Sequence, residues 1–250
     1  MLLQKIDLSQ FFRKLNKILY FIMSLSIEKY YFKPISIIEG LSPEHANFLI
    51  RKMQRLEIKK GKILFKEGAY PRGVFILRKG KVKIFQTNKE GKEQIMYFYK
   101  KGEVFGYRPI LSNETNPVSA QTLEDCVVSF IPKNSFIQIL NSSVFLSNKL
   151  LANLAFEFTV WVNKVSVFTQ QPVKERVALS LLILEEKYRL ENSSKLATIN
   201  LSRDDIASYV GTAKETLVRV LKEFKEKKYI ESKGRRITIL SLKGLEKIIN

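Results

Sequence analysis

Cysteine and histidine are almost missing from this sequence, which holds one of each in 250 residues. A single cysteine, Cys126, excludes an internal disulfide and cannot by itself build a zinc or iron–sulfur site. It stands in the apolar run CVVSFIP, where a buried small hydrophobic side chain is favoured over a reactive thiol. A single histidine, His45, excludes the set of inward-facing histidines that holds a metal in cupin-type enzymes, and it offers no pattern for haem binding. We therefore predict no metal site and no cofactor.

Sequence motifs of catalysis are also lacking. Gly68 and Gly73 have the glycine spacing of a phosphate-binding loop, but Val74 and Phe75 follow where that loop needs Lys and Ser or Thr. No nucleophile elbow and no nucleophile paired with histidine is found. The acidic pair Asp204 and Asp205 is explained by helix capping. We predict that the protein is not an enzyme and has no catalytic residues.

Long apolar runs are lacking as well. The run Ile18–Leu25 follows several basic residues, in the layout of a secretory signal. It is too short to span a bilayer and has no convincing small-residue cleavage site. Residues 1–33 are therefore interpreted as a helical extension, and the protein is expected in the cytoplasm without a membrane partner. Met23 is an alternative start, so the sequence leaves open whether residues 1–22 belong to the native protein.

Acidic residues are few beside the basic ones. The chain has 43 Lys and Arg against 24 Asp and Glu, a formal net charge of +19. Such an excess favours polyanionic partners, above all nucleic acid. The charge is spread along the chain, but residues 212–236 carry nine basic and four acidic side chains. This segment is the best candidate for a surface that contacts phosphates.

From Ile35 to Pro132 the sequence consists of short β runs separated by glycines. The glycines recur at roughly ten-residue intervals, the rhythm of an antiparallel sandwich or roll. We predict an eight-stranded, jelly-roll-like domain, preceded by a small helix near Pro43–Met53. The glycines that set this rhythm are Gly61, Gly68, Gly80, Gly91 and Gly102.

A long helix is predicted over Val144–Phe168, which contains no proline or glycine. Its apolar residues recur in steps of three, four or seven, and its charges are few, so it needs packing partners on two sides. One side is expected to pack on the roll. The other packs either on its twin in a dimer or inside the same chain. Residues 170–172 form a hinge, a second helix covers Val173–Tyr188, and a polar linker spans Glu191–Ser194. The residues predicted for the dimer interface are Leu150, Leu154, Phe158, Trp161, Val165 and Phe168.

The stretch Ser202–Leu240 has the spacing of a helix-turn-helix followed by a β-hairpin. Gly211 permits the positive φ of a sharp turn. Ser202 with Asp205, and Thr212 with Glu215, have the spacing of helix-start caps. The hairpin surrounds a basic turn, and a helix-turn-helix with such a β-wing is a winged helix.

The second helix, predicted over residues 212–227, turns one polar face away from the core. Arginine can pair with guanine, glutamate can accept from cytosine and valine can contact a thymine methyl group, so this face suits a DNA major groove. The alternative is a capping glutamate on an ordinary solvated basic face. The predicted base contacts are Lys214, Glu215, Val218 and Arg219. The predicted phosphate contacts are Ser202, Thr212, Thr216, Lys222, Lys225, Lys233, Arg235 and Arg236.

The order roll, long helix, hinge and winged helix resembles the Crp/Fnr family of bacterial transcription regulators, over about residues 35–248. The most specific likeness is IASYVGTAKETLVRVLKEFKEKKYI, with a less specific one in GVFILRKGKVKIF. The resemblance implies an α+β protein that binds double-stranded DNA as a homodimer, with half-sites about one DNA turn apart. RNA polymerase would be a further partner of an activator. The expected division is an extension (1–33), an antiparallel β-roll resembling cyclic-nucleotide-binding domains (34–142), a dimerisation helix with hinge (143–171) and a winged helix-turn-helix domain (172–250).

The expected effector pocket departs from the family's pattern. Members that bind cyclic nucleotides carry a ribose-binding glutamate and a phosphate-binding Arg-Ser or Arg-Thr pair. This sequence has Tyr107 at the first place, and Pro117 and Val118 at the second. A cyclic phosphate would lack its charge partner, so cAMP is not expected and the effector stays open. The alternative function is a ligand-sensing protein that acts mainly through protein contacts. The residues assigned to the pocket are Phe105, Gly106, Tyr107 and Arg108.

Overall fold

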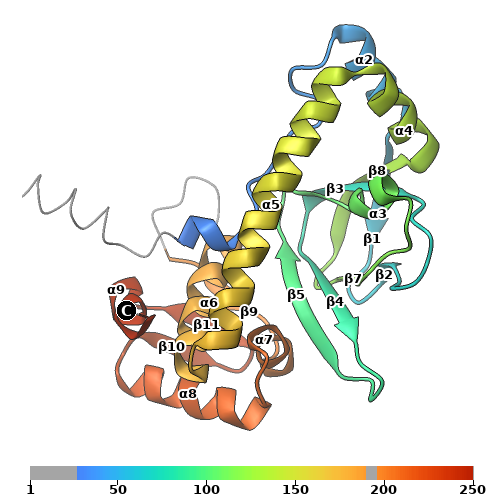
Figure 1. The fold of residues 1–250 in the computed structure, drawn as a ribbon. Coiled ribbons are helices and arrows are strands. Elements are labelled where there is room, and N and C mark those ends of the chain that lie inside the picture. The colour runs from blue at the N-terminus through green and yellow to red at the C-terminus, as the bar shows by residue number, and fades with distance from the viewer. Residues whose placement is uncertain (1–26, 190–195, 250) are drawn as a thin grey trace, which may run out of the picture.

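The computed structural model describes residues 27–189 and 196–249, so the expected linker Glu191–Ser194 and most of the N-terminal extension lie outside the described residues. A β-roll, a long helix beside it and a small α/β domain below follow one another along the chain (Figure 1). None of the helices in the described part has the length and hydropathy of a membrane-spanning segment.

Two antiparallel four-stranded sheets form the roll, which confirms the predicted β architecture. The first has the order β1 (Gln54–Ile58), β8 (Cys126–Pro132), β3 (Gly73–Lys79), β6 (Val104–Phe105). The second has the order β2 (Ile63–Phe65), β7 (Ser119–Thr122), β4 (Val82–Thr87), β5 (Glu93–Tyr99). Before the roll come a 3-10 helix, η1 (Ile27–Tyr30), and α2 (Pro43–Lys52). After β6 and β8 come α3 (Arg108–Ser112) and α4 (Lys133–Ser142).

Gly80 shows why the predicted glycine rhythm marks turns. It joins β3 to β4 with a φ of 92°, a left-handed conformation that favours glycine. A Cβ atom there would lie 2.5 Å from the Cys126 Sγ atom. Cys126 is itself buried, and burial raises the pKa of its thiol, in line with its interpretation as a packing residue.

The helix α5 (Val144–Gln170) begins at Ser143, whose side chain accepts a hydrogen bond from the Leu146 amide. It runs beside the roll and ends at Gln171, and after Pro172 the chain continues as α6 (Val173–Tyr188). The C-terminal domain then adds β9 (Thr198–Asn200), α7 (Arg203–Val210), α8 (Lys214–Glu226), β10 (Ile230–Lys233), β11 (Arg236–Ile239) and α9 (Leu242–Ile249). The strand β9, which extends the predicted hairpin to three strands in the order β10-β11-β9, is not predicted from the sequence.

The C-terminal domain docks on the free edge of β5. The Ser208 hydroxyl on α7 donates to the Glu93 carbonyl (2.5 Å) and accepts from the Ile95 amide (3.1 Å), so it pairs with the strand edge as another strand would. Lys83 of β4 reaches across to Asp205 of α7 (3.0 Å). Figure 1 shows α7 beside the β4–β5 hairpin. The roll and the C-terminal domain are therefore in direct contact.

Candidate nucleic-acid interface

The turn between α7 and α8 follows from its residues. The Ser202 hydroxyl caps α7 by accepting from the Asp205 amide (3.0 Å), as the spacing predicts. Gly211 ends α7 in the left-handed region, with a φ of 70°. The predicted cap at Thr212 is wrong, because the N-cap of α8 is the next residue, Ala213. No side chain caps this helix start. The helix predicted over residues 212–227 is thus α8, Lys214–Glu226.

Apolar side chains of α7 and α8 fix the two helices against each other and against the sheet. They share one core with α6 and the wing, in which Leu217, Leu221 and Phe224 supply the inner face of α8. Helical periodicity then leaves the opposite face of α8 to solvent. The buried partners on α7 are Ile206, Ala207, Tyr209 and Val210.

All four side chains predicted to contact bases lie exposed on this outer face of α8. Lys214, Glu215 and Arg219 are exposed, and Val218 is 47% exposed although it is apolar. Lys214 pairs with Asp204 of α7 at 3.0 Å. The exposed part of this valine is available to a thymine methyl group.

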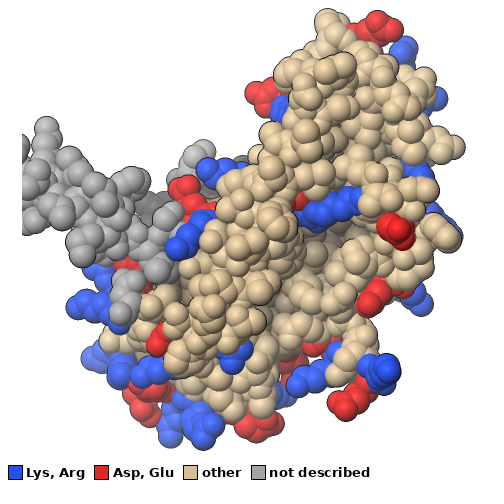
Figure 2. Space-filling view, viewed as in Figure 1, with Lys and Arg blue, Asp and Glu red and all other residues tan. Residues whose placement is uncertain are grey.

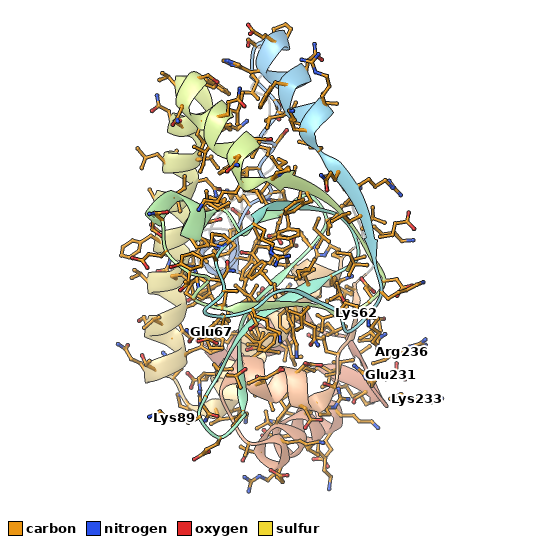
Figure 3. All side chains as sticks on the ribbon, turned by 90° about the vertical axis from the view of Figure 1, so that its right-hand side faces the viewer. Lys62, Glu67, Lys89, Glu231, Lys233 and Arg236 are labelled. Carbon is orange, nitrogen blue, oxygen red and sulfur yellow. The ribbon has the colours of Figure 1, made fainter. Side chains whose placement is uncertain are left out.

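The predicted phosphate contacts surround that face. Lys222, Lys225, Lys233, Arg235 and Arg236 are exposed, whereas Thr212 and Thr216 are half-buried. Figure 3 shows Lys233 and Arg236 at the outer edge of the wing, and Figure 2 shows Lys and Arg side chains gathered around the C-terminal domain. The Ser202 hydroxyl is already engaged, because it also donates to the Asp205 carboxylate.

Arg203 is a residue that the sequence interpretation misses. Its guanidinium donates to the Ser232 hydroxyl (2.6 Å) and to the Gly234 carbonyl (2.9 Å), so it ties the start of α7 to the wing turn. Burial lowers the pKa of this side chain. Only its place at the first position of a predicted helix was visible in the sequence, and its partners lie about thirty residues further on.

Three of the four predicted effector residues, Phe105, Gly106 and Arg108, line one small cavity. A cavity of about 40 Å³ is lined by Phe105, Gly106, Arg108, Pro117 and Val118 among others. That volume suits one or two water molecules. Arg108 and Pro117 also border a wider surface depression of about 530 Å³, which Leu154 of α5 closes on one side. Tyr107, the fourth residue predicted for the pocket, does not line this cavity; it is fully buried, with its hydroxyl bonded to Glu157 of α5.

Arg108 is paired inside the protein instead. Its Nε and Nη2 atoms donate to the Glu157 carboxylate of α5, at 2.8 Å for Nε, and its Nη1 atom donates to the Tyr99 hydroxyl at 3.2 Å. Tyr107 donates to the same carboxylate at 2.8 Å, and the Asn153 amide donates at 3.0 Å. Burial raises the pKa of Tyr99 to about 12. The guanidinium is thus already matched by a carboxylate, and a phosphate would have to displace it.

The exposed face of α5 differs from the predicted dimer interface. Leu150 is buried inside the protomer and Phe168 packs beside α6, because these positions face the roll and the C-terminal domain. Trp161 packs against the roll core. Phe158 and Val165 are exposed, as predicted, at 70% and 59%, and Leu154 is half-buried. The exposed positions that repeat in alternating steps of four and three are Val144, Asn148, Leu151, Ala155, Phe158, Val162, Val165 and Thr169.

Within residues 27–189 and 196–249, no group of three or more His, Cys, Asp or Glu side chains is placed to hold a metal ion.

Comparison with known proteins matches both halves of the chain. Residues 55–143 match the model of a cyclic nucleotide-binding domain, and residues 175–248 match that of a Crp-like helix-turn-helix domain. The transcriptional activator protein anr of Pseudomonas aeruginosa is 30% identical over 184 residues, which cover 73% of this chain and 75% of that protein. The fumarate and nitrate reduction regulatory protein of Yersinia pestis is 27% identical over 192 residues, which cover 76% of each chain.

Among solved structures, FixK2 from Bradyrhizobium japonicum superposes with a TM-score of 0.71 at 22% identity, covering 79% of this chain and 98% of that one. A putative transcriptional regulator from Eubacterium rectale superposes with a TM-score of 0.70 at 19% identity, covering 86% and 98%. These likenesses establish the fold.

Proposed function

The chain belongs to the Crp/Fnr family of transcription regulators, and we propose that it acts in the cytoplasm as a homodimer that reads a palindromic operator with α8. The observation that carries this proposal is the outer face of α8. Lys214, Glu215, Val218 and Arg219 are exposed together on it, while the inner face is buried. A groove-reading helix needs this division.

The exposed stripe of α5 supports the dimer. Its alternating steps of four and three place Leu151, Phe158, Val162 and Val165 on one seam, and each of these apolar side chains is at least half exposed in the protomer. A seam with this repeat is covered when two copies of the helix pair as a coiled coil. An isologous pair would set the two α8 helices about a twofold axis, which a palindromic site matches.

The effector is not cAMP in this proposal. The Arg108 guanidinium is occupied by Glu157, the neighbouring cavity is about 40 Å³, and Pro117 and Val118 supply no charge for a phosphate. We expect millimolar cAMP to leave both the melting temperature and the DNA affinity unchanged, because a ligand that binds the folded state would raise the first. A cAMP-dependent shift in either quantity would contradict this part of the proposal.

RNA polymerase is the expected protein partner if this chain, like its relatives named as transcriptional activators, activates transcription. The test of the whole proposal is selection of DNA fragments by the purified protein, followed by sequencing. A palindromic motif with half-sites about 10 base pairs apart is expected from a dimer of this kind. Recovery of unrelated fragments would remove sequence-specific reading and favour a protein that acts through protein contacts.

A further inference from the structure

The segment Ile27–Lys33 lies outside the residues matched by either family model, yet it is packed in the middle of the molecule. It contains η1, which lies beside both α5 and α6 in Figure 1. Two of its aromatic side chains, Tyr30 and Phe32, are only 4% and 2% exposed. A solvent-exposed tail would not bury such residues, so the segment belongs to the folded body.

Phe32 attaches the segment to the roll and to α5. Its ring stacks on Tyr97 of β5 with centroids 4.0 Å apart, and it meets Trp161 of α5 edge-on at 5.8 Å. Its backbone amide donates to the Tyr97 hydroxyl at 2.7 Å. The Arg108 guanidinium lies 5.2 Å from the ring centroid. Phe32 therefore touches the same charged network that closes the effector region.

Tyr30 attaches the segment to the C-terminal domain. It forms a small buried cluster with Leu179 and Ile183 of α6, against which Val167 and Phe168 from the last turn of α5 also pack. The Lys29 carbonyl accepts a hydrogen bond from the Asn163 amide of α5 at 3.3 Å. The segment thus spans the junction on both sides of the hinge at residues 170–172.

A buried polar contact reinforces this junction. Lys187 of α6 pairs with Glu103 of the roll at 2.5 Å, and both side chains are 2% exposed. Tyr97 donates to the same carboxylate at 2.9 Å and accepts from Lys187. Because the Tyr97 hydroxyl also accepts from the Phe32 amide, the segment completes the hydrogen bonding of a contact between roll and C-terminal domain. An incomplete buried network of this kind is costly.

We propose that Ile27–Lys33 is a built-in positioning segment that fills the junction of roll, α5 and α6 and fixes each DNA-binding domain relative to the dimer helix. This inference rests on the proposed function. A dimer reads two half-sites together only when both recognition helices are held at the right separation. A domain that rotates freely about residues 170–172 must be fixed in one orientation when the dimer binds an operator. The conformational entropy lost in that step weakens operator binding. Binding to random DNA does not require the two recognition helices to be held at a fixed separation.

The test compares Phe32→Ala and Tyr30→Ala with wild type in the full chain, on the selected operator and on random DNA at one salt concentration. We expect operator affinity to fall about tenfold while random-DNA affinity and dimer mass stay unchanged, because only the preorganisation of the two domains is lost. The backbone amides of Gln171 and Arg176, which donate hydrogen bonds on either side of the hinge, should exchange hydrogen faster in the variants. Phe32→Leu, which keeps most of the apolar volume, should give an intermediate loss and covers the case in which Phe32→Ala does not fold.

Phe136→Ala is the matched control. Phe136 of α4 is also fully buried, but it belongs to a different core cluster, which does not include residues of the junction segment Ile27–Lys33. It should lower the free energy of unfolding by a similar amount and leave operator affinity intact. Equal loss of operator affinity in Phe136→Ala, or wild-type or tighter operator binding by both Phe32→Ala and Tyr30→Ala, overturns the inference. If wild type itself does not prefer any operator over random DNA, the proposed function has failed and not the role of the segment.

Discussion

The outer face of α8 and the network around Arg108 both consist of charged side chains, but they stand in opposite environments. On α8 the side chains Glu215 and Arg219 are exposed. In the network, Glu157 is 4% exposed and receives hydrogen bonds from three neighbours, Arg108, Tyr107 and Asn153. Exposed charges keep their capacity to bind a partner, whereas buried charges must be matched inside the protein. The difference separates a surface for recognition from a site that is internally satisfied.

The exposed apolar seam of α5 affects every specific contact with DNA at once, because the proposed operator site needs two copies of α8. Phe158→Glu or Val165→Glu places a charge at the centre of a coiled-coil interface. We expect monomers in sedimentation and at least about a hundredfold weaker operator binding, since a monomer reads one half-site only. Tyr70→Glu is the matched control, because Tyr70 is 75% exposed and lies between β2 and β3 of the roll, outside α5. A dimer that persists in both seam variants would refute this interface.

The Arg108–Glu157 pair tests whether buried charges must be matched inside the protein. Glu157→Ala leaves the Arg108 guanidinium and the Tyr107 hydroxyl without their partner, and we expect it to lower the free energy of unfolding by ~3–5 kcal/mol. Replacing both residues, with Arg108→Leu and Glu157→Leu, should cost less than Glu157→Ala alone because no charge is left unmatched. Urea unfolding of the variants measures the difference.

The exposed pair Lys59–Asp125, with side chains 81% and 61% exposed, is the control. Asp125→Ala should change the unfolding free energy far less than Glu157→Ala, because solvent already screens that pair. Equal effects at the two pairs would show that burial does not govern the cost, and the proposed contrast between the open and closed sites would fail.

The sequence predicted the outer face of α8 but not the Arg108–Glu157 network, and the contacts of the two sites explain the difference. The face of α8 follows from periodicity within one helix, so Glu215 and Arg219 could be assigned from local spacing. The partner of Arg108 lies 49 residues away on α5, and helical periodicity did not single out Glu157 among the apolar residues around it. The same periodicity assigned Leu150 and Trp161 to the dimer interface, because it finds apolar faces but does not say which of two neighbours covers each one.

The fold was largely predictable where glycine turns and helix caps act locally. The eight strands of the roll and the bounds of α6 agree with the prediction, whereas β9 was missed because three residues, Thr198–Asn200, carry too little pattern. The Thr212 cap failed because a threonine and a glutamate at the right spacing do not decide between two adjacent start positions. Phe32 was assigned to an extension for a related reason, since its partners Tyr97 and Trp161 are distant in the sequence.

Arg219 and Lys225 test the exposed face of α8. Arg219 is predicted to contact a base and Lys225 a phosphate, so the two variants separate two kinds of DNA contact on one helix. We expect Arg219→Ala to weaken operator binding by ~1–3 kcal/mol and to relax the preference at one base position. Lys225→Ala should weaken binding to operator and random DNA alike and reduce the slope of log K against log salt by about one unit. Titrations on both DNAs at several salt concentrations measure these effects. Equal loss on operator and random DNA in Arg219→Ala would remove base reading by this residue.

Lys164 tests whether a buried cation behaves unlike the exposed cations on α8. Its side chain on α5 is 6% exposed and donates to the Met96 carbonyl at 2.7 Å, and burial, followed by repulsion from Lys187, lowers its pKa to about 7. The unfolded chain therefore binds the extra proton more readily between about pH 7 and the ordinary lysine pKa near 10.4. Stability contributed by this group rises with pH across that window, by up to about 1.4 kcal/mol per pH unit.

Lys164→Met should remove that slope, so the difference in unfolding free energy between wild type and variant should change in favour of wild type as the pH rises from 7 to 9. Urea unfolding at pH 7, 8 and 9 measures it, with the exposed Lys225→Met as the matched control that keeps the wild-type slope. A Lys164→Met variant with the same pH dependence as wild type would show that this amine keeps its proton inside the fold. The aromatic rings of Trp161 and Tyr209, 5.1 and 4.7 Å from the Nζ atom, would then be enough to hold the buried charge.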